Sequence, residues 1–141
     1  MNKEHENNMI GMVVIILSVL FFLSLAKCQA RDWTRVTTAI AQVESKGNPR
    51  AVNGDAVGLL QIRPILVRDI NRILRLRKSD KRYTLADRYD PQKSREMFEI
   101  YQSYYNPSGS VEKAIRLWNG GSGYTNRGTQ SYYNKVRREM K

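Results

Sequence analysis

The sequence is poor in side chains commonly used for nucleophilic or metal-dependent catalysis. Among its 141 residues, Cys28 is the only cysteine and His5 is the only histidine. A single cysteine cannot form an intramolecular disulfide or a cysteine-based metal cluster. A single histidine in a polar N-terminal tail supplies neither a serine–histidine or cysteine–histidine pair nor a histidine-rich zinc site. Acid–base chemistry must therefore use carboxylates, and we expect no metal and no cofactor.

Acidic residues are also scarce, with 13 Asp and Glu against 24 Lys and Arg and a net charge of +11. Such a balance indicates an anionic polymer as partner: nucleic acid, a membrane surface or cell wall. The densest basic stretch contains Arg68, Arg72, Arg75, Arg77, Lys78, Lys81 and Arg82. We interpret it as a solvated face, with its first three arginines on the outer side of a helix. Because no nucleic-acid recognition motif is present, nucleic acid is not the expected partner.

The chain contains one long apolar run, residues 9–26, which carries no charge. Its length fits the core of a secretory signal or a short membrane anchor. Flanking charges do not decide the orientation, because Lys3 and the amino terminus oppose Glu4 and Glu6. We expect residues 1–30 to be a signal peptide or membrane anchor. Residues 31–141 would then be one exported domain, in the periplasm or cell envelope.

Helical periodicity dominates the rest of the chain, and no alternating strand pattern persists. The expected helices begin after caps or prolines, near Thr34, Pro64, Pro91, Ser110 and Thr129. A long polar connection, residues 77–90, separates the second helix from the third. We predict a small all-α domain of about five helices without internal repeats.

Glu44 is the carboxylate that helical spacing singles out. It follows Val36 and Ile40 at intervals of four residues, so it continues the apolar stripe to the end of the first helix. Gly47 and Pro49 then end that helix. Partial burial and the negative end of the helix dipole both raise the pKa of a carboxyl there, as a general acid on a glycosidic oxygen requires. Spacing alone also fits a surface glutamate at a frayed helix end.

Several motifs resemble the soluble lytic transglycosylase family, and they occur in the family's order. Glu44-Ser45 precedes residues 47–52, GNPRAV, and residues 58–62, GLLQI. Trp118-Asn119-Gly120-Gly121 is similar to a Tyr-Asn-Gly-Gly loop, and Tyr133-Asn-Lys-Val136 to a final Tyr-x-x-Val helix. The resemblance covers roughly residues 33–138. It implies a lysozyme-like α fold that cleaves the MurNAc–GlcNAc β-1,4 bond of peptidoglycan strands.

The resemblance also implies roles for the matched residues. Glu44 would be the sole catalytic acid/base and would produce a 1,6-anhydro-MurNAc end without water or metal. The substrate contacts would come from Ser45, Gly58, Leu59, Leu60, Gln61, Asn119, Tyr124 and Tyr133. In this set Gly58 would let the backbone approach the saccharide, and Tyr133 would touch the Glu44 carboxyl. Leu59 and Leu60 would line the groove, although both also fit an ordinary core.

Two alternatives remain open at this level. Asp55 lies in the loop before Gly58 and could be a second carboxylate that positions water, as in goose-type lysozymes, which would make the protein a hydrolytic muramidase. A non-catalytic cell-wall-binding module could instead use the basic stretch. The sequence fits general wall turnover or a machine for secretion, conjugation or phage infection. If uncleaved, residues 9–26 would add a membrane contact.

Overall fold

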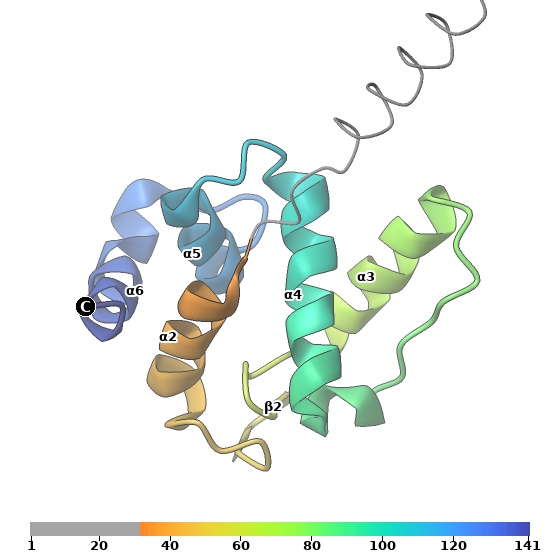
Figure 1. Cartoon of the computed structure of the whole chain (residues 1–141), viewed down its shortest axis with the longest axis horizontal. Helices are drawn as coiled ribbons and strands as arrows, with labels where there is room; N and C mark the ends of the chain where they lie inside the picture. Colours follow the sequence, from red (N-terminus) through yellow and green to blue (C-terminus); the bar gives the residue numbers. More distant parts are fainter. Residues whose placement is uncertain (1–31) are drawn as a thin grey trace, which may run out of the picture. The chain divides into compact units, whose positions relative to one another are not determined.

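A computed structural model describes residues 32–141. The predicted signal or anchor, Cys28 and His5 lie outside these residues. The described chain folds into five α-helices: α2 (Thr34–Ser45), α3 (Pro64–Leu76), α4 (Pro91–Tyr105), α5 (Val111–Gly120) and α6 (Asn126–Glu139) (Figure 1). The predicted all-α domain of about five helices is thus confirmed here. Within residues 32–141, no helix has the length and apolarity needed to cross a membrane.

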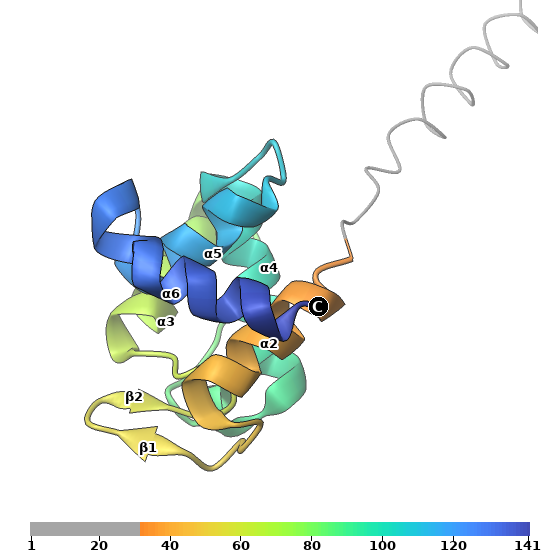
Figure 2. The same cartoon turned by 90° about the vertical axis from the view of Figure 1, so that its left-hand side faces the viewer.

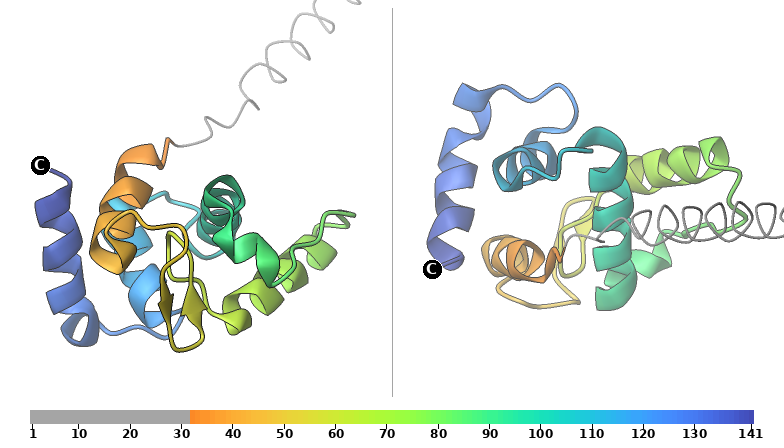
Figure 3. Two further views of the ribbon diagram at one scale, coloured as in Figure 1. Left: turned by 90° about the horizontal axis from the view of Figure 1, so that it is seen from below. Right: turned by 45° about the horizontal axis from the view of Figure 1, so that its top comes forward.

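The helices form two groups that share one core. α6 packs across α2 and α5, and its C-terminal end lies beside the start of α2 (Figure 2). The Nε of Arg35 on α2 donates to the Met140 carbonyl at 2.9 Å, which fixes that crossing. α3 packs against α4, and a 3₁₀ turn, η1 (Ala86–Tyr89), packs at the start of α4. The segment of residues 51–62 lies between α2 and α3 (Figure 3).

Side-chain caps set the starts of the last three helices. The Asp90 carboxylate accepts from the backbone N–H groups of Gln92 and Lys93, and the Ser110 hydroxyl accepts from that of Lys113. The last helix begins at Asn126, three residues before the predicted start, because Thr125 is its cap. Thr129 lies inside the helix instead, and its buried hydroxyl donates to the Thr125 carbonyl at 2.8 Å.

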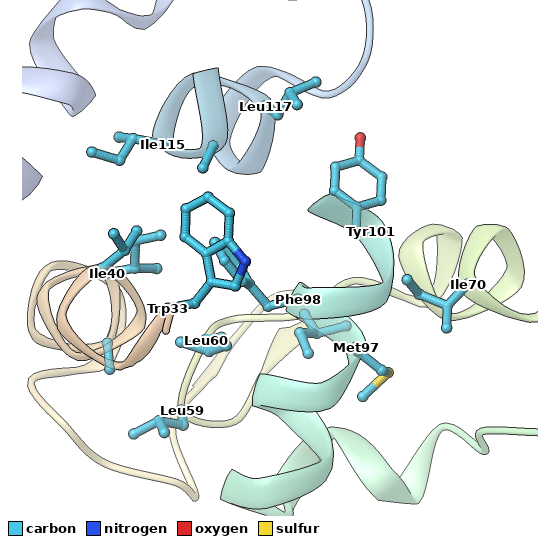
Figure 4. Close-up of a cluster of buried hydrophobic side chains, with 14 of the residues drawn as sticks. Trp33, Ile40, Leu59, Leu60, Ile70, Met97, Phe98, Tyr101, Ile115 and Leu117 are labelled. Carbon is cyan, nitrogen blue, oxygen red and sulfur yellow. The ribbon is translucent and has the colours of Figure 1, made fainter. Parts of the chain in front are cut away.

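Phe98 of α4 lies at the centre of the core (Figure 4). Its ring packs against Trp33 with centroids 5.7 Å apart and against Trp118 with centroids 5.0 Å apart. Ile40 from α2 and Ile115 from α5 are also completely buried in the same cluster. Burial of such side chains contributes roughly 1.5–3 kcal/mol each, so this cluster is a major source of the domain's stability.

The loop predicted after α2 contains a short antiparallel hairpin. β1 (Val52–Asn53) pairs with β2 (Ala56–Val57), with Val52 opposite Val57. Residues 54 and 55 form its tip, where Gly54 has a φ of 61°. The sequence did not reveal these strands, because two residues are too few for an alternating pattern.

Gly58 follows the hairpin at a point of very close backbone approach. Its φ is +79°, and a Cβ at this position would lie 1.9 Å from the carbonyl oxygen of Arg88. The buried Arg88 side chain reaches back, and its Nη1 donates to the carbonyls of Asp55 at 2.9 Å and Ile62 at 3.1 Å. The predicted role of Gly58 therefore needs correction: the backbone that it lets approach is that of η1, inside the protein.

Candidate functional site

An open cleft of about 880 Å³ contains the Glu44 carboxylate. Its lining comes from the end of α2, the segment of residues 51–62, α3, α4 and the end of α5. A volume near the top of the usual ligand-site range of about 300–1,000 Å³ suits an extended ligand. Of the residues predicted to form the site, Glu44, Gln61 and Asn119 line this cleft.

Glu44 is half-buried in the last turn of α2, as its position on the apolar stripe predicted. Burial raises the pKa of its carboxyl above the usual range, and a hydrogen bond from Tyr132 partly opposes that rise. The Tyr132 hydroxyl donates to Oε1 of Glu44 at 2.7 Å. The negative end of the helix acts in the same direction as burial. The site therefore favours a protonated carboxyl more than open solvent does.

The tyrosine that contacts Glu44 is Tyr132, which corrects the expectation for Tyr133. The Tyr133 ring instead lies against the guanidinium of Arg116, whose Cζ is 4.5 Å from the ring centroid. Successive helical residues point about 100° apart, so only one of the two can face α2. Tyr132 lies four residues before the buried Val136, and this spacing could have identified it.

Ser45 and Gln61 hold the segment that runs beside Glu44. The Ser45 hydroxyl donates to the Leu59 carbonyl at 2.7 Å and so ties the end of α2 to this segment. The Gln61 side chain donates to the Gly58 carbonyl at 2.9 Å, and its backbone has a φ of 51°. Gln61 thus lines the cleft while its amide nitrogen braces the loop.

Leu59, Leu60 and Tyr124 do not line the cleft, contrary to the prediction. Leu59 is 7% exposed and Leu60 is fully buried, so both belong to the core. Tyr124 packs on the same core from the loop after α5. The segment turns the leucine side chains inward, and the Leu60 carbonyl accepts a hydrogen bond from the Trp118 Nε1 at 3.2 Å.

Asn119 lies in the last turn of α5, where the sequence predicted a loop. It is exposed and lines the cleft beside Trp118. Its side-chain amide makes no hydrogen bond within residues 32–141, to Glu44 or to any other group. The amide is therefore available to a ligand in the cleft.

Asp55 lies at the hairpin tip and does not line the cleft with Glu44. Its side chain is 53% exposed and pairs with Nε of Arg63 at 2.8 Å. The second carboxylate of the cleft is Asp69 on α3, which the sequence analysis missed. In the part of the chain described here, no three His, Cys, Asp or Glu side chains cluster as a metal site would require.

Arginines of α3 also line the cleft, which corrects their interpretation as a purely solvated face. Arg68, Arg72 and Arg75 share one side of the helix, as predicted, but that side faces the same cleft as Glu44. Tyr101 and Tyr105 of α4 add aromatic lining. Helical spacing could place these arginines together, but what they face depends on tertiary packing.

A comparison with family models identifies the family of the chain. The model of the transglycosylase SLT domain family matches residues 23–141, most of the chain, and so covers every element described above. A comparison with curated proteins found no match. SLT domains are typical of peptidoglycan lytic transglycosylases, and the family acts on peptidoglycan. The small helical domain and the match together show that the chain belongs to the transglycosylase SLT domain family, within the lysozyme-like superfamily.

Proposed function

We propose that this protein is a peptidoglycan lytic transglycosylase that cleaves the MurNAc–GlcNAc β-1,4 bond. The observation that carries the proposal is the half-buried Glu44 in an open cleft, with a raised carboxyl pKa and Tyr132 bound to one oxygen. Membership of the SLT family supports peptidoglycan as the substrate.

In the first step, protonated Glu44 donates its proton to the glycosidic oxygen. The bond between this oxygen and C1 of MurNAc breaks, and the leaving sugar departs with a free hydroxyl group. In the second step, the Glu44 carboxylate accepts the proton of the MurNAc C6 hydroxyl as O6 closes onto C1. The product is a 1,6-anhydro-MurNAc end, Glu44 is protonated again, and no water is consumed.

Tyr132 has a distinct part in this scheme. Its hydroxyl occupies Oε1 of Glu44, which leaves Oε2 for the proton that is transferred. A hydrogen bond to a carboxylate is stronger than one to a neutral carboxyl group. Tyr132 therefore stabilises the charge that appears on Glu44 after the first step more than the starting state.

Hydrolysis with Asp55 as second carboxylate is the main alternative. In retaining and in inverting glycosidases, two carboxylates flank the scissile bond within one site. Asp55 is exposed, pairs with Arg63 and is outside the lining of the cleft. Asp69 does line the cleft, but Arg72 and Tyr105 both bind its carboxylate, so this geometry favours the single-residue scheme. A non-catalytic wall-binding module remains the second alternative, and the experiment below separates all three.

The test compares Glu44→Gln with Asp55→Asn in digestion of purified sacculi. We expect Glu44→Gln to lower the rate by about 10²–10⁴-fold, the usual contribution of a general acid/base, while sacculi still bind. Asp55→Asn is expected to retain activity. Lysis by Glu44→Gln at the native rate would contradict the mechanism, and loss of lysis in Asp55→Asn as well as in Glu44→Gln would favour the muramidase. If the native chain binds sacculi without cleaving them, it is a binding module.

We further propose that the domain acts outside the cytoplasm, in the periplasm or cell envelope, because its substrate is there. Residues 1–30 would direct export as a cleaved signal or remain as an anchor. N-terminal sequencing of the exported protein separates these two forms: a start after residue 26 or 30 indicates cleavage, and an intact N-terminus indicates an anchor.

A further inference from the structure

The cleft that holds Glu44 also carries an unusual concentration of positive charge. Its lining includes four arginine side chains, one from the segment before α3 and three from α3 itself: Arg63, Arg68, Arg72 and Arg75. Residues 68, 72 and 75 are four and three positions apart, so they follow one line along the helix. Two acidic side chains, Glu44 and Asp69, line the same cleft. Arg63 pairs with Asp55 and Arg72 pairs with Asp69, so within the described chain the positive charge without a partner on this wall belongs to Arg68 and Arg75.

Arg72 is fixed at the middle of this line. Its Nη2 lies 2.7 Å from Oδ1 of Asp69 and donates to the Tyr105 hydroxyl at 2.8 Å. The Tyr105 hydroxyl in turn donates to Oδ2 of Asp69 at 2.9 Å. Contacts from both α3 and α4 therefore hold one edge of the guanidinium in a fixed orientation.

Arg68 and Arg75 lie one turn to either side of Arg72 and differ from it. Both are exposed, and their side chains have no ion pair or hydrogen bond with any residue from 32 to 141. The cleft thus offers two uncommitted guanidinium groups around a fixed one. A planar guanidinium with free N–H donors matches the geometry of a carboxylate.

We propose that this arginine row, Arg68, Arg72 and Arg75, binds the carboxylates of the stem peptide carried by MurNAc. The inference rests on the proposed function, since it takes peptidoglycan as the ligand of the cleft. The sugar rings themselves offer hydroxyl and amide groups, which require no row of cations. The stem peptide is the part of the polymer that presents several carboxylates within a few residues of the glycan. Its binding would make peptide-bearing strands better ligands than peptide-free ones.

Non-specific attraction to an anionic wall is the competing explanation. It predicts that any two cations of the surface matter equally. The chain offers a matched control in Arg137 and Arg138, which lie in the last turn of α6 and do not line the cleft. Changing Arg68 and Arg75 to glutamine removes two positive charges from the row. Changing Arg137 and Arg138 to glutamine removes the same charge but leaves the row intact.

The test measures binding to full chains that also carry Glu44→Gln, so that turnover does not interfere. Calorimetry would compare a peptidoglycan tetrasaccharide bearing stem peptides with the same glycan after an amidase has removed them. We expect Arg68→Gln with Arg75→Gln to weaken binding of the peptide-bearing glycan about tenfold, the size expected for two exposed charge pairs. Binding of the peptide-free glycan should stay unchanged, and Arg137→Gln with Arg138→Gln should bind both as the parent does.

Three results would overturn the proposal. Equal weakening for both glycans would assign the row to the sugar chain or to the lactyl carboxylate, which the peptide-free glycan retains. Equal weakening in the control pair would indicate non-specific attraction, and no weakening would remove any role. Cleavage by the native chain is measured separately. A chain that binds through the row but does not cleave would refute the proposed function and leave this inference standing.

Discussion

The two walls of the cleft are built in opposite ways. On one wall, Glu44 is half-buried at the end of a helix, and Tyr132 from a second helix binds its carboxyl. On the other wall, Arg68 and Arg75 are exposed and uncommitted among the described residues, and Arg72 alone is braced by Asp69 and Tyr105. One wall has a single carboxyl in a low-dielectric setting, and the other has a row of solvated cations.

The difference follows from what each wall has to do in the proposed scheme. A general acid needs a pKa shifted toward the working pH and a fixed position, and burial against two helices supplies both. Recognition of a flexible, charged peptide needs reach and charge, which exposed arginines provide at little folding cost. Substitutions on the two walls should therefore have different effects on the protein.

The largest effect is expected at Gly58, because its segment connects both walls. A Cβ there would meet the Arg88 carbonyl oxygen at 1.9 Å, in addition to the cost of a positive φ. Gly58→Ala should destabilise the domain by about 2–5 kcal/mol, combining left-handed strain with overpacking. Gly54→Ala, with a φ of +61° and open space around it, should cost about 1–2 kcal/mol. Chemical denaturation measures both, and equal losses would refute the close-approach argument.

The next largest effect is expected for Tyr132→Phe, which tests only the wall of the cleft that contains Glu44. Tyr132→Phe removes the hydrogen bond that lowers the Glu44 pKa, so that pKa should rise further. Activity requires protonated Glu44, and its alkaline limb should therefore move to higher pH. The maximal rate should fall about tenfold, because the carboxylate formed in the reaction loses a donor. Tyr133→Phe is the control and should leave the pH–rate profile in place. A shift of the alkaline limb in Tyr133→Phe, or no shift in Tyr132→Phe, would contradict the assignment of Tyr132 as the tyrosine that acts on Glu44.

A smaller effect concerns stability rather than rate. Burial holds the folded-state pKa of Glu44 above its ordinary value of 4.5, so ionisation favours the unfolded chain. Below pH 4.5 the native protein and Glu44→Gln should be equally stable. As pH rises from 4.5 through the folded-state pKa, the native protein should lose stability relative to the variant. Thermal unfolding at pH 4 and pH 8 checks this, and a difference that does not grow with pH would contradict it.

The smallest effect belongs to the arginine wall. Exposed charge pairs are screened within about 8–10 Å at physiological ionic strength. Affinity for peptide-bearing glycan should therefore fall several-fold between low and physiological salt, and less steeply when Arg68 and Arg75 are glutamine. Calorimetry at two salt concentrations measures both slopes. Identical slopes for native and variant chains would show that these arginines do not meet anions in the cleft.

The sequence predicted well wherever a local pattern determines the outcome. Helical spacing placed Glu44 at the end of the first helix, and Asp90 with Pro91 marked a helix start at its observed position. The start of α6 was predicted less well, because Thr125 and Thr129 are both suitable caps. Thr129 is excluded as the cap by burial, which local sequence does not report.

Such local patterns do not predict the contacts between helices and loops. The choice between Tyr132 and Tyr133 depends on how α6 crosses α2, and one residue changes the direction of a side chain by about 100°. Leu60 was expected in the groove but is fully buried, since the fold of its segment decides which side faces inward. Helical spacing placed the arginine row on one face of a helix. It could not show that this face lines the cleft, because the opposite wall comes from other parts of the chain.

In the proposed mechanism Glu44 acts alone, and the C6 hydroxyl of MurNAc, not water, attacks C1. Digestion of sacculi in H₂¹⁸O, followed by mass spectrometry of the released fragments, tests it directly. This mechanism predicts 1,6-anhydro-MurNAc ends without ¹⁸O. Reducing MurNAc ends with ¹⁸O at C1 would show that water is the acceptor and would contradict it.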